Sequence, residues 1–387
     1  MGFGSAVAMW AVGYAGRLPA VMLPGPALLA ALFACLVAGG FVLGRATGRG
    51  PAHGAMAGLV AGTINLLVLG SFLGAAPFAL LWVPGSILLA SALTAAGAAL
   101  ATTVPAHPSA APNWLGAFAG VAAAAVLFLL VVGGVVTSAG AGLAVVDWPN
   151  SYGYNMFLYP FSRMTGGIYY EHAHRLFGAL VGLTTLTLAL QLKLGGARRA
   201  LRRMGWVALA LVVTQGLIGG LRVTGRLTLS SAAGSMRPSL ALALVHGVMG
   251  QVLFSLLVIL ALVGSRAWDR AEPPPQAGRD RVLGSLLVAL LLVQLVLGAV
   301  QRHLGSLLLA HIVFGVAIVA PAIVHVGFRS WAARGGRSLP GRLGLALVGA
   351  VALQLVLGLA AFTALRGVAA GDFPAGFPAA APTAVPA

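Results

Sequence analysis

Apolar runs of about 20 residues recur along the whole chain, and they limit its possible folds more than any other feature. A helix of that length crosses the roughly 30 Å hydrocarbon core of a bilayer, where only helices and closed barrels satisfy their backbone polar groups. Hydrophobic residues make up 60% of the chain and charged residues only 7%, with a mean hydropathy of +1.00. We therefore predict an all-α, polytopic membrane protein, built as a helical bundle.

Short polar or proline-rich stretches divide the chain into three regions. Residues 1–110 form an accessory region of about three membrane helices, in which the apolar but short stretch 1–16 has no assigned place. Residues 111–272 form a first four-helix repeat, and residues 273–387 form a second repeat without its last helix. The predicted helices span 22–44, 54–75, 78–103, 115–138, 168–192, 204–222, 239–263, 282–301, 307–328 and 342–365.

Arginine is distributed unevenly between the loops, and this sets the predicted orientation. The loops 193–203, 264–281 and 329–342 are the most basic, whereas 139–167 and 223–238 carry fewer arginines. Because basic loops stay in the cytoplasm, the other two face outward, and ten spans place the N-terminus outside as well. The net charge of +17 is explained by basic loops that face anionic lipid, so we exclude a nucleic-acid partner.

Three ionisable residues, Glu171, His174 and Arg175, open the fifth predicted helix. The chain has only six acidic residues, and ionisable groups at membrane depth are costly and usually face a partner inside the bundle. His174 and His246 both lie roughly 10 Å below the outer surface if each residue adds 1.5 Å of rise. His311 lies just inside the outer end of its helix, so three helices present histidine at one level.

Histidines on facing helices are suited to hold a haem iron from both sides, and helix bundles often carry cofactors in this way. Taken alone, His246 is better explained by a hydrogen bond to a neighbouring helix. Together with His174 at the same depth, ligation becomes the better interpretation. A glycine four residues after each histidine would leave a bare patch of helix for the macrocycle. These glycines are Gly178, Gly250 and Gly315.

The other polar residues near these histidines receive lesser roles. Glu171 shares a helix face with His174, whereas His172 points roughly the opposite way and is given an interfacial place or one behind the ligand. The loop 139–167 carries Asp147-Trp148-Pro149 and several aromatic residues, which predict either an ordered lid or an aromatic belt at the interface. His303 and His325 are predicted to be interfacial, and His53 and His107 receive no role.

The second half of the chain repeats the first in parallel topology. The aligned runs are 174–178 with 311–315, 211–220 with 353–359, and 131–137 with 295–301. On this alignment Leu308 stands where the first half has Glu171, which indicates one reactive site and one electron-transfer site. The helix 239–263 has no counterpart, so we expect either a truncated sequence or a second haem that is lost or ligated differently.

The run from Gly140 to Pro149, the pattern Glu171-x-x-His174-Arg175 and the repeated histidine helices resemble the haem A synthase (CtaA/Cox15) family over about residues 115–365. The resemblance implies that the first repeat holds haem O, the substrate, between His174 and His246, with Arg175 at the cofactor site. It also implies that His311 is one ligand of haem b and that Glu171 is the essential carboxylate. The implied reaction oxidises a methyl group of haem O to the formyl group of haem A, with oxygen from water.

The same resemblance implies a location and partners. The protein would lie in a bacterial cytoplasmic membrane with its haem sites toward the outer face, beside a haem O synthase and the assembly pathway of cytochrome c oxidase. Membrane lipid and an unidentified electron acceptor are further expected partners, and a homo-oligomer is compatible. Cys35 is the sole cysteine, so the cysteine pair of many bacterial members is absent. A non-catalytic cytochrome b-like electron carrier or haem-handling protein would use the same histidines.

Overall fold

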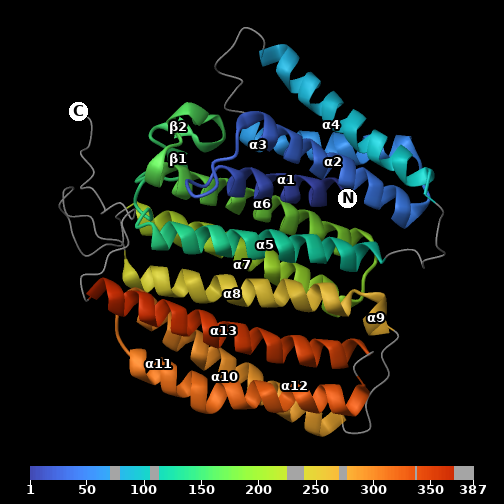
Figure 1. Ribbon diagram of the computed structural model, residues 1–387. Helices are drawn as coiled ribbons and strands as arrows, with labels where there is room; N and C mark the ends of the chain where they lie inside the picture. The colour runs from blue at the N-terminus through green and yellow to red at the C-terminus, as the bar shows by residue number, and fades with distance from the viewer. Residues whose placement is uncertain (70–78, 105–112, 225–238, 270–276, 336–337, 370–387) are drawn as a thin grey trace, which may run out of the picture. The chain divides into compact units, whose positions relative to one another are not determined.

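The computed structural model describes residues 1–69, 79–104, 113–224, 239–269, 277–335 and 338–369. Nearly all regular structure within them is helical (Figure 1). Ten of these helices are long and apolar enough to cross a membrane. The chain divides into two compact units, Met1–Arg270 and Ala271–Ala387. The predicted all-α membrane class is confirmed, whereas most of the predicted hinge 104–114 and loop 223–238 lies outside the described residues.

Close packing of small residues holds the N-terminal helices together. Helices α2 and α3 carry glycines four residues apart, a spacing that lets helix backbones approach each other in a membrane, and both helices pack against α4. A Cβ on Gly58 would lie 2.5 Å from the Cα atom of Ser91, and one on Gly54 would lie 2.6 Å from the carbonyl oxygen of Thr94. Only glycine fits there. The bounds are α1 Gly2–Gly16, α2 Gly25–Thr47, α3 Pro51–Leu69 and α4 Ala79–Thr102.

Helix α1, which the sequence leaves without a place, packs against α2 and α3 on one side and against α5 and α6 on the other. Trp10 and Tyr14 contact the ring of Phe177 edge to face, at 5.5 Å and 6.0 Å between ring centres. The hydroxyl of Tyr169 donates to the carbonyl oxygen of Tyr14 at 2.9 Å. The N-terminal helices therefore share one apolar core with the helices that follow.

The position of α1 also changes the expected side of the N-terminus. Met1 lines the same hollow as Thr47, Arg49 and His53, so it lies at the end of the bundle where α2 is joined to α3. If the ten predicted spans were the only helices, the N-terminus would lie at the opposite end from Arg49. Because α1 precedes them, Met1 lies at the same end as Arg49.

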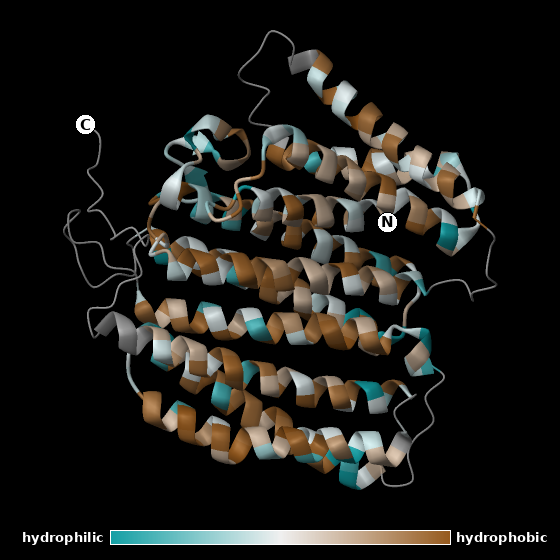
Figure 2. Cartoon of the chain, in the orientation of Figure 1, coloured by the Kyte–Doolittle hydropathy of each residue, from teal (hydrophilic) through white to brown (hydrophobic). Residues whose placement is uncertain are grey.

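Helices α5 (Trp114–Ser138), α6 (Gly166–Leu194), α7 (Arg199–Val223) and α8 (Leu240–Val263) form a closed ring, in which each helix packs against its two neighbours. Hydrophobic residues predominate along these helices (Figure 2), as burial in lipid requires. Asn113 caps α5 by accepting from the backbone N–H of Leu115 at 3.2 Å, and Ser239 caps α8 in the same way. The short helix α9 (Arg266–Asp269) follows α8.

The loop between α5 and α6, residues 139–165 and called the hairpin loop below, is ordered. It contains the strands β1 (Asn150–Ser151) and β2 (Tyr154–Asn155), followed by the helical turns η2 (Met156–Leu158) and η3 (Phe161–Arg163). Tyr152 and Gly153 both have positive φ, 51° and 78°, as a two-residue hairpin turn requires. We call the end of the α5–α8 ring that carries this loop the hairpin end.

The second unit contains the remaining helices. Its second membrane span is made of α11 (Leu308–Phe314), a turn of π-helix η5 (Gly315–Val319) and α12 (Ala320–Arg334). It follows α10 (Ala277–Leu304), and α12 packs against α13 (Leu339–Ala369). Widened helical turns are frequent at functional sites, and this one begins directly after the turn that carries His311.

Candidate functional site

Helices α6 and α8 carry the predicted histidines at similar depth. His174 lies about eight residues into α6 and His246 about six residues into α8, which correspond to roughly 12 Å and 9 Å of helix rise. Both helices begin at the hairpin end. The two histidines thus share a level within the ring, as the sequence predicts.

The structure brings these two side chains together across the ring. The imidazole centres of His174 and His246 lie 6.3 Å apart, with their planes at 72°. Two metal–imidazole bonds of about 2.0 Å, with about 1.1 Å more from each nitrogen to its ring centre, give roughly 6 Å. Nδ1 of His174 is buried without a hydrogen-bond partner among the described residues. The pair therefore fits the two axial positions of one haem iron.

Each imidazole lies against a glycine of the preceding helix. A Cβ on Gly133 of α5 would lie 3.0 Å from Cε1 of His174, and one on Gly219 of α7 would lie 3.3 Å from Cε1 of His246. Any larger side chain at these positions would push the imidazole away from its present place. These two glycines therefore help to fix the histidine rings.

The glycines four residues after the histidines do not all leave a bare patch. A Cβ on Gly250 would lie 3.1 Å from Nε2 of Gln215, and this amide donates to the carbonyl oxygen of His246 at 2.9 Å. Gly250 makes room for a glutamine, so the bare patch predicted there is wrong. Nothing lies within 4 Å of a Cβ on Gly178, so only that position agrees with the prediction.

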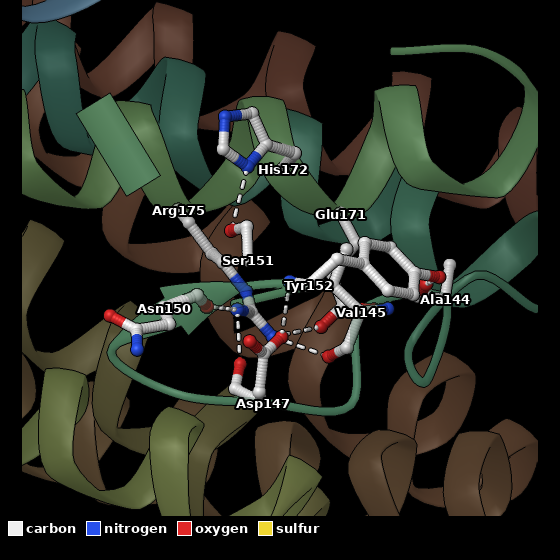
Figure 3. A network of polar contacts seen from close by, with 9 residues as sticks. All are labelled: Ala144, Val145, Asp147, Asn150, Ser151, Tyr152, Glu171, His172 and Arg175. Atoms are coloured by element: carbon white, nitrogen blue, oxygen red, sulfur yellow. Dashed lines mark hydrogen bonds and ion pairs between the residues drawn. The ribbon is translucent and has the colours of Figure 1, made fainter. Parts of the chain in front are cut away.

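Arg175 ties the hairpin loop to α6 (Figure 3). Its Nη1 donates to the carbonyl oxygens of Asp147 at 2.6 Å and Asn150 at 2.9 Å. Its Nη2 donates to the carbonyl oxygen of Val145 at 2.5 Å and to Oε1 of Glu171 at 2.8 Å. The four terminal N–H groups of the guanidinium are thus used within the protein. These contacts support a role in holding the loop rather than the predicted role at a cofactor.

Glu171 is held from two sides. It is only 4% exposed, and its Oε2 accepts from the backbone N–H of Val145 at 3.0 Å while Oε1 pairs with Arg175. Both carboxyl oxygens of Glu171 therefore have donors within the protein. The site contains a carboxyl group held in one orientation at the hairpin end of α6.

Asp147 organises the hairpin turn. Its carboxylate oxygens accept from the backbone N–H groups of Tyr152 and Gly153, each at 2.8 Å. Partial burial acts to raise the pKa of Asp147, but these hydrogen bonds and the charge of Arg175 outweigh it, so the pKa lies below its usual value. The motif Asp-Trp-Pro thus begins with the residue that closes the turn.

His172 faces the hairpin loop and not His246. It is 1% exposed, its Nδ1 lies 3.0 Å from the hydroxyl of Ser151, and its ring packs on that of Tyr159 at 4.9 Å between centres. This position agrees with the second of the two predicted places for His172, behind the proposed iron ligand His174. The structure therefore separates the roles of the two neighbouring histidines, His172 and His174.

The sequence reasoning missed two contacts at the hairpin end of α7. The Trp148 ring lies so close to Gly220 that a Cβ there would overlap it, and Nη2 of Arg222 lies 2.5 Å from where a Cβ on Gly142 would be. The guanidinium of Arg222 also interacts electrostatically with Glu171 and His174. The sequence signal for Arg222 is an arginine in the last turn of an apolar helix. Arginines that merely lie at the membrane interface occur at the same position, so the signal does not distinguish the two cases.

The second unit repeats part of this arrangement around His311. A Cβ on Gly298 would lie 3.0 Å from Cε1 of His311, the same distance as between Gly133 and His174. The aligned runs pair Gly298 with Gly134, so that alignment is shifted by one residue. Nε2 of Gln294 contacts Nδ1 of His311 at 3.2 Å and its carbonyl oxygen at 3.1 Å.

The environment of Gly315 differs from the predicted bare patch. A Cβ there would lie 2.7 Å from Nε2 of Gln294, so a glutamine amide fills this space as well. His325 is exposed and His53 lies 3.1 Å from Nη1 of Arg49, whereas His107 lies outside the described residues. Among the described residues no group of three or more His, Cys, Asp or Glu side chains could hold a free metal ion.

A sequence model of the COX15-CtaA family, described as cytochrome oxidase assembly protein, matches residues 116–312. This stretch is about half of the chain and includes Glu171, both paired histidines, Arg222 and His311. No curated protein and no solved structure matches the chain. The matched residues run from the first turn of α5 to α11 and leave out helices α1 to α4.

Proposed function

The chain belongs to the COX15-CtaA family of cytochrome oxidase assembly proteins, and from this premise we propose that it is a haem A synthase. The proposed reaction oxidises the methyl group of haem O to the formyl group of haem A. The family and the ten candidate spans make the chain an integral membrane protein with a role in cytochrome oxidase assembly. The substrate, the reaction and the residues that carry it are the proposal.

The separation of His174 and His246 is the observation that carries this proposal. Imidazole centres 6.3 Å apart, on facing helices and at one depth, suit a porphyrin iron bound from both sides. Small residues at Gly133 and Gly219 hold both rings in place. We propose that haem O is bound here as substrate, toward the outer face of a bacterial cytoplasmic membrane.

The reaction requires that the substrate lose electrons and protons while it gains one oxygen atom. A methyl group and one water molecule become a formyl group, four protons and four electrons. Haem b, with His311 as one ligand, would carry single electrons from the substrate to an acceptor. The hairpin loop and Trp148, which packs on Gly220, would limit the access of bulk water to the first site.

Glu171 is the residue that we propose to act on the reacting carbon. Its negative charge, fixed by Val145 and Arg175, would stabilise positive charge that develops as the methyl group is oxidised. Proton acceptance is the second role open to a carboxylate. Because both oxygens of Glu171 already accept hydrogen bonds, the contacts favour the electrostatic role.

Expression beside a haem O synthase, followed by extraction and mass analysis of the haems, tests the proposal. The wild-type chain should yield haem A, and His174→Ala and His246→Ala should each yield haem O without the formyl product. The matched control is His53→Ala, which removes an exposed histidine distant in the sequence from His174 and His246. This variant should keep full conversion of haem O to haem A. Undiminished haem A from either ligand variant would refute the proposed site.

A second candidate function is a non-catalytic cytochrome b-like electron carrier or haem-handling protein. The observation that favours it is the ion pair of Glu171 with Arg175, because this carboxylate already has a structural task in fixing the hairpin loop. Glu171→Gln keeps the shape and can still accept from Val145. An enzyme should lose product formation in this variant while keeping its bound haem, whereas a carrier should show no formyl product even as wild type.

A further inference from the structure

The guanidinium of Arg222 is a cation at the hairpin end that the hydrogen-bond network leaves out. It lies in the last turn of α7, three residues after Gly219, which packs on the ring of His246. Its Nε is buried and has no hydrogen-bond partner among the described residues. A buried donor without a partner is destabilising, and more so when the group is charged. An anionic ligand would supply the partner that this nitrogen lacks.

The surroundings of Arg222 indicate where such a ligand would lie. The guanidinium of Arg222 packs against the backbone of the hairpin loop at Gly142. Its charge interacts with both Glu171 and His174. The guanidinium is therefore close to the paired histidines and at their hairpin side. A porphyrin held between His174 and His246 would have one edge directed toward this end of the ring.

The other cations that the structure describes at this end already have partners. Arg175 gives all four terminal N–H groups to the loop and to Glu171. Arg17 lies over the ring of Phe161 at 5.3 Å, and Arg163 lies over the ring of Tyr154 at 5.6 Å. Of the cations described at this end, Arg222 is thus the one best placed to meet a new negative charge.

We propose that Arg222 binds a propionate carboxylate of the porphyrin in the first site, and that Arg175, predicted from sequence to contact the cofactor, does not. A planar guanidinium matches a carboxylate in two parallel hydrogen bonds. The proposal rests on the part of the proposed function that places a haem between His174 and His246. It does not require that the chain convert haem O to haem A.

A titration with two probes tests this proposal. The first probe is haem b and the second is its dimethyl ester, which has the same iron and ring but no carboxylate charge. Both are added to the purified apoprotein in detergent, in a His311→Ala background, and binding is followed by the visible spectrum of a bis-imidazole haem. The variants are Arg222→Gln and Arg222→Lys, and the control is Arg163→Gln.

We expect the parent protein to bind haem b about tenfold to a hundredfold more tightly than the diester. Arg222→Gln should lose this preference while its affinity for the diester stays unchanged, Arg222→Lys should keep part of it, and Arg163→Gln all of it. Equal affinities in the parent, or an equal loss for both probes in Arg222→Gln, would overturn the proposal. A bis-imidazole spectrum with preference for the acid but no haem A in cells would instead refute only the catalytic function.

Discussion

The α5–α8 ring and the second unit use the same device to place a histidine but differ in what surrounds it. In both, a Cβ placed on a glycine of the preceding helix would lie 3.0 Å from the Cε1 atom of the imidazole. Glutamine amides contact the backbone of His246 and His311 alike. Among the residues that the structure describes, only the first unit adds a buried carboxylate paired with an arginine near its histidine, together with the hairpin loop. Helix pairing therefore suffices to place an imidazole, whereas the carboxyl group of Glu171 is held by the hairpin loop as well.

The largest effect should come from filling the space beside one imidazole at a time. Gly133→Leu would drive a side chain into the ring of His174, and Gly298→Leu would do so at His311. Each variant should lose the haem of its own site and keep the other, as measured by haem content and by the spectrum of the purified protein. Gly134→Leu is the control, because nothing lies within 4 Å of a Cβ there. Simultaneous loss of both haems from one substitution would contradict independent sites.

The next effect concerns the ion pair that only the first unit has. Arg175→Gln leaves Glu171 buried without its charged partner, which costs about 3–5 kcal/mol in buried pairs. Limited proteolysis should then cut within residues 139–165 at a rate far above that of the wild type. The aligned residue of the second unit is Ile312, and Ile312→Ala should leave this loop protected. If the loop stayed protected in Arg175→Gln, the contacts of Arg175 would not be needed to hold it.

A smaller effect should follow from the titration of Asp147. Because its pKa is lowered in the folded protein, its stabilising contribution is present above the ordinary value of about 4 and is lost as the pH falls through the folded value. The hairpin loop should therefore become more accessible to acid-tolerant protease as the pH falls below about 4. Asp147→Asn should remove this pH dependence and loosen the loop at neutral pH. The same acid response in both proteins would assign the transition to another group.

The smallest effect should come from the glutamines that the two units share. Gln215→Ala and Gln294→Ala each remove a hydrogen bond to a histidine carbonyl oxygen, worth about 1 kcal/mol. Gln294→Ala also removes a contact to the imidazole ring itself, so it should loosen its haem more than Gln215→Ala does. Haem retention during dilution measures the difference. A larger loss in Gln215→Ala would reverse the comparison.

The sequence predicts those features that depend on helix length and rise. The apolar runs give the spans, and counting 1.5 Å per residue places His174 and His246 at one level. Contacts between helices are a different matter, because they depend on how neighbouring helices are rotated. The role of Gly250 beside Gln215 and the position of Arg222 could not be derived from spacing along one helix. The hairpin turn was also missed, because Tyr152 adopts a positive φ that tyrosine rarely takes.

The docking of α1 on α6 has a consequence for protein engineering. Shortening the polypeptide to residues 113–387, where the family resemblance lies, would strip Trp10 and Tyr14 from Phe177 and Tyr169. An aromatic surface on the back of the histidine-bearing helix would then be left to detergent or to a neighbouring molecule. A minimal version of this protein should therefore keep its first helix.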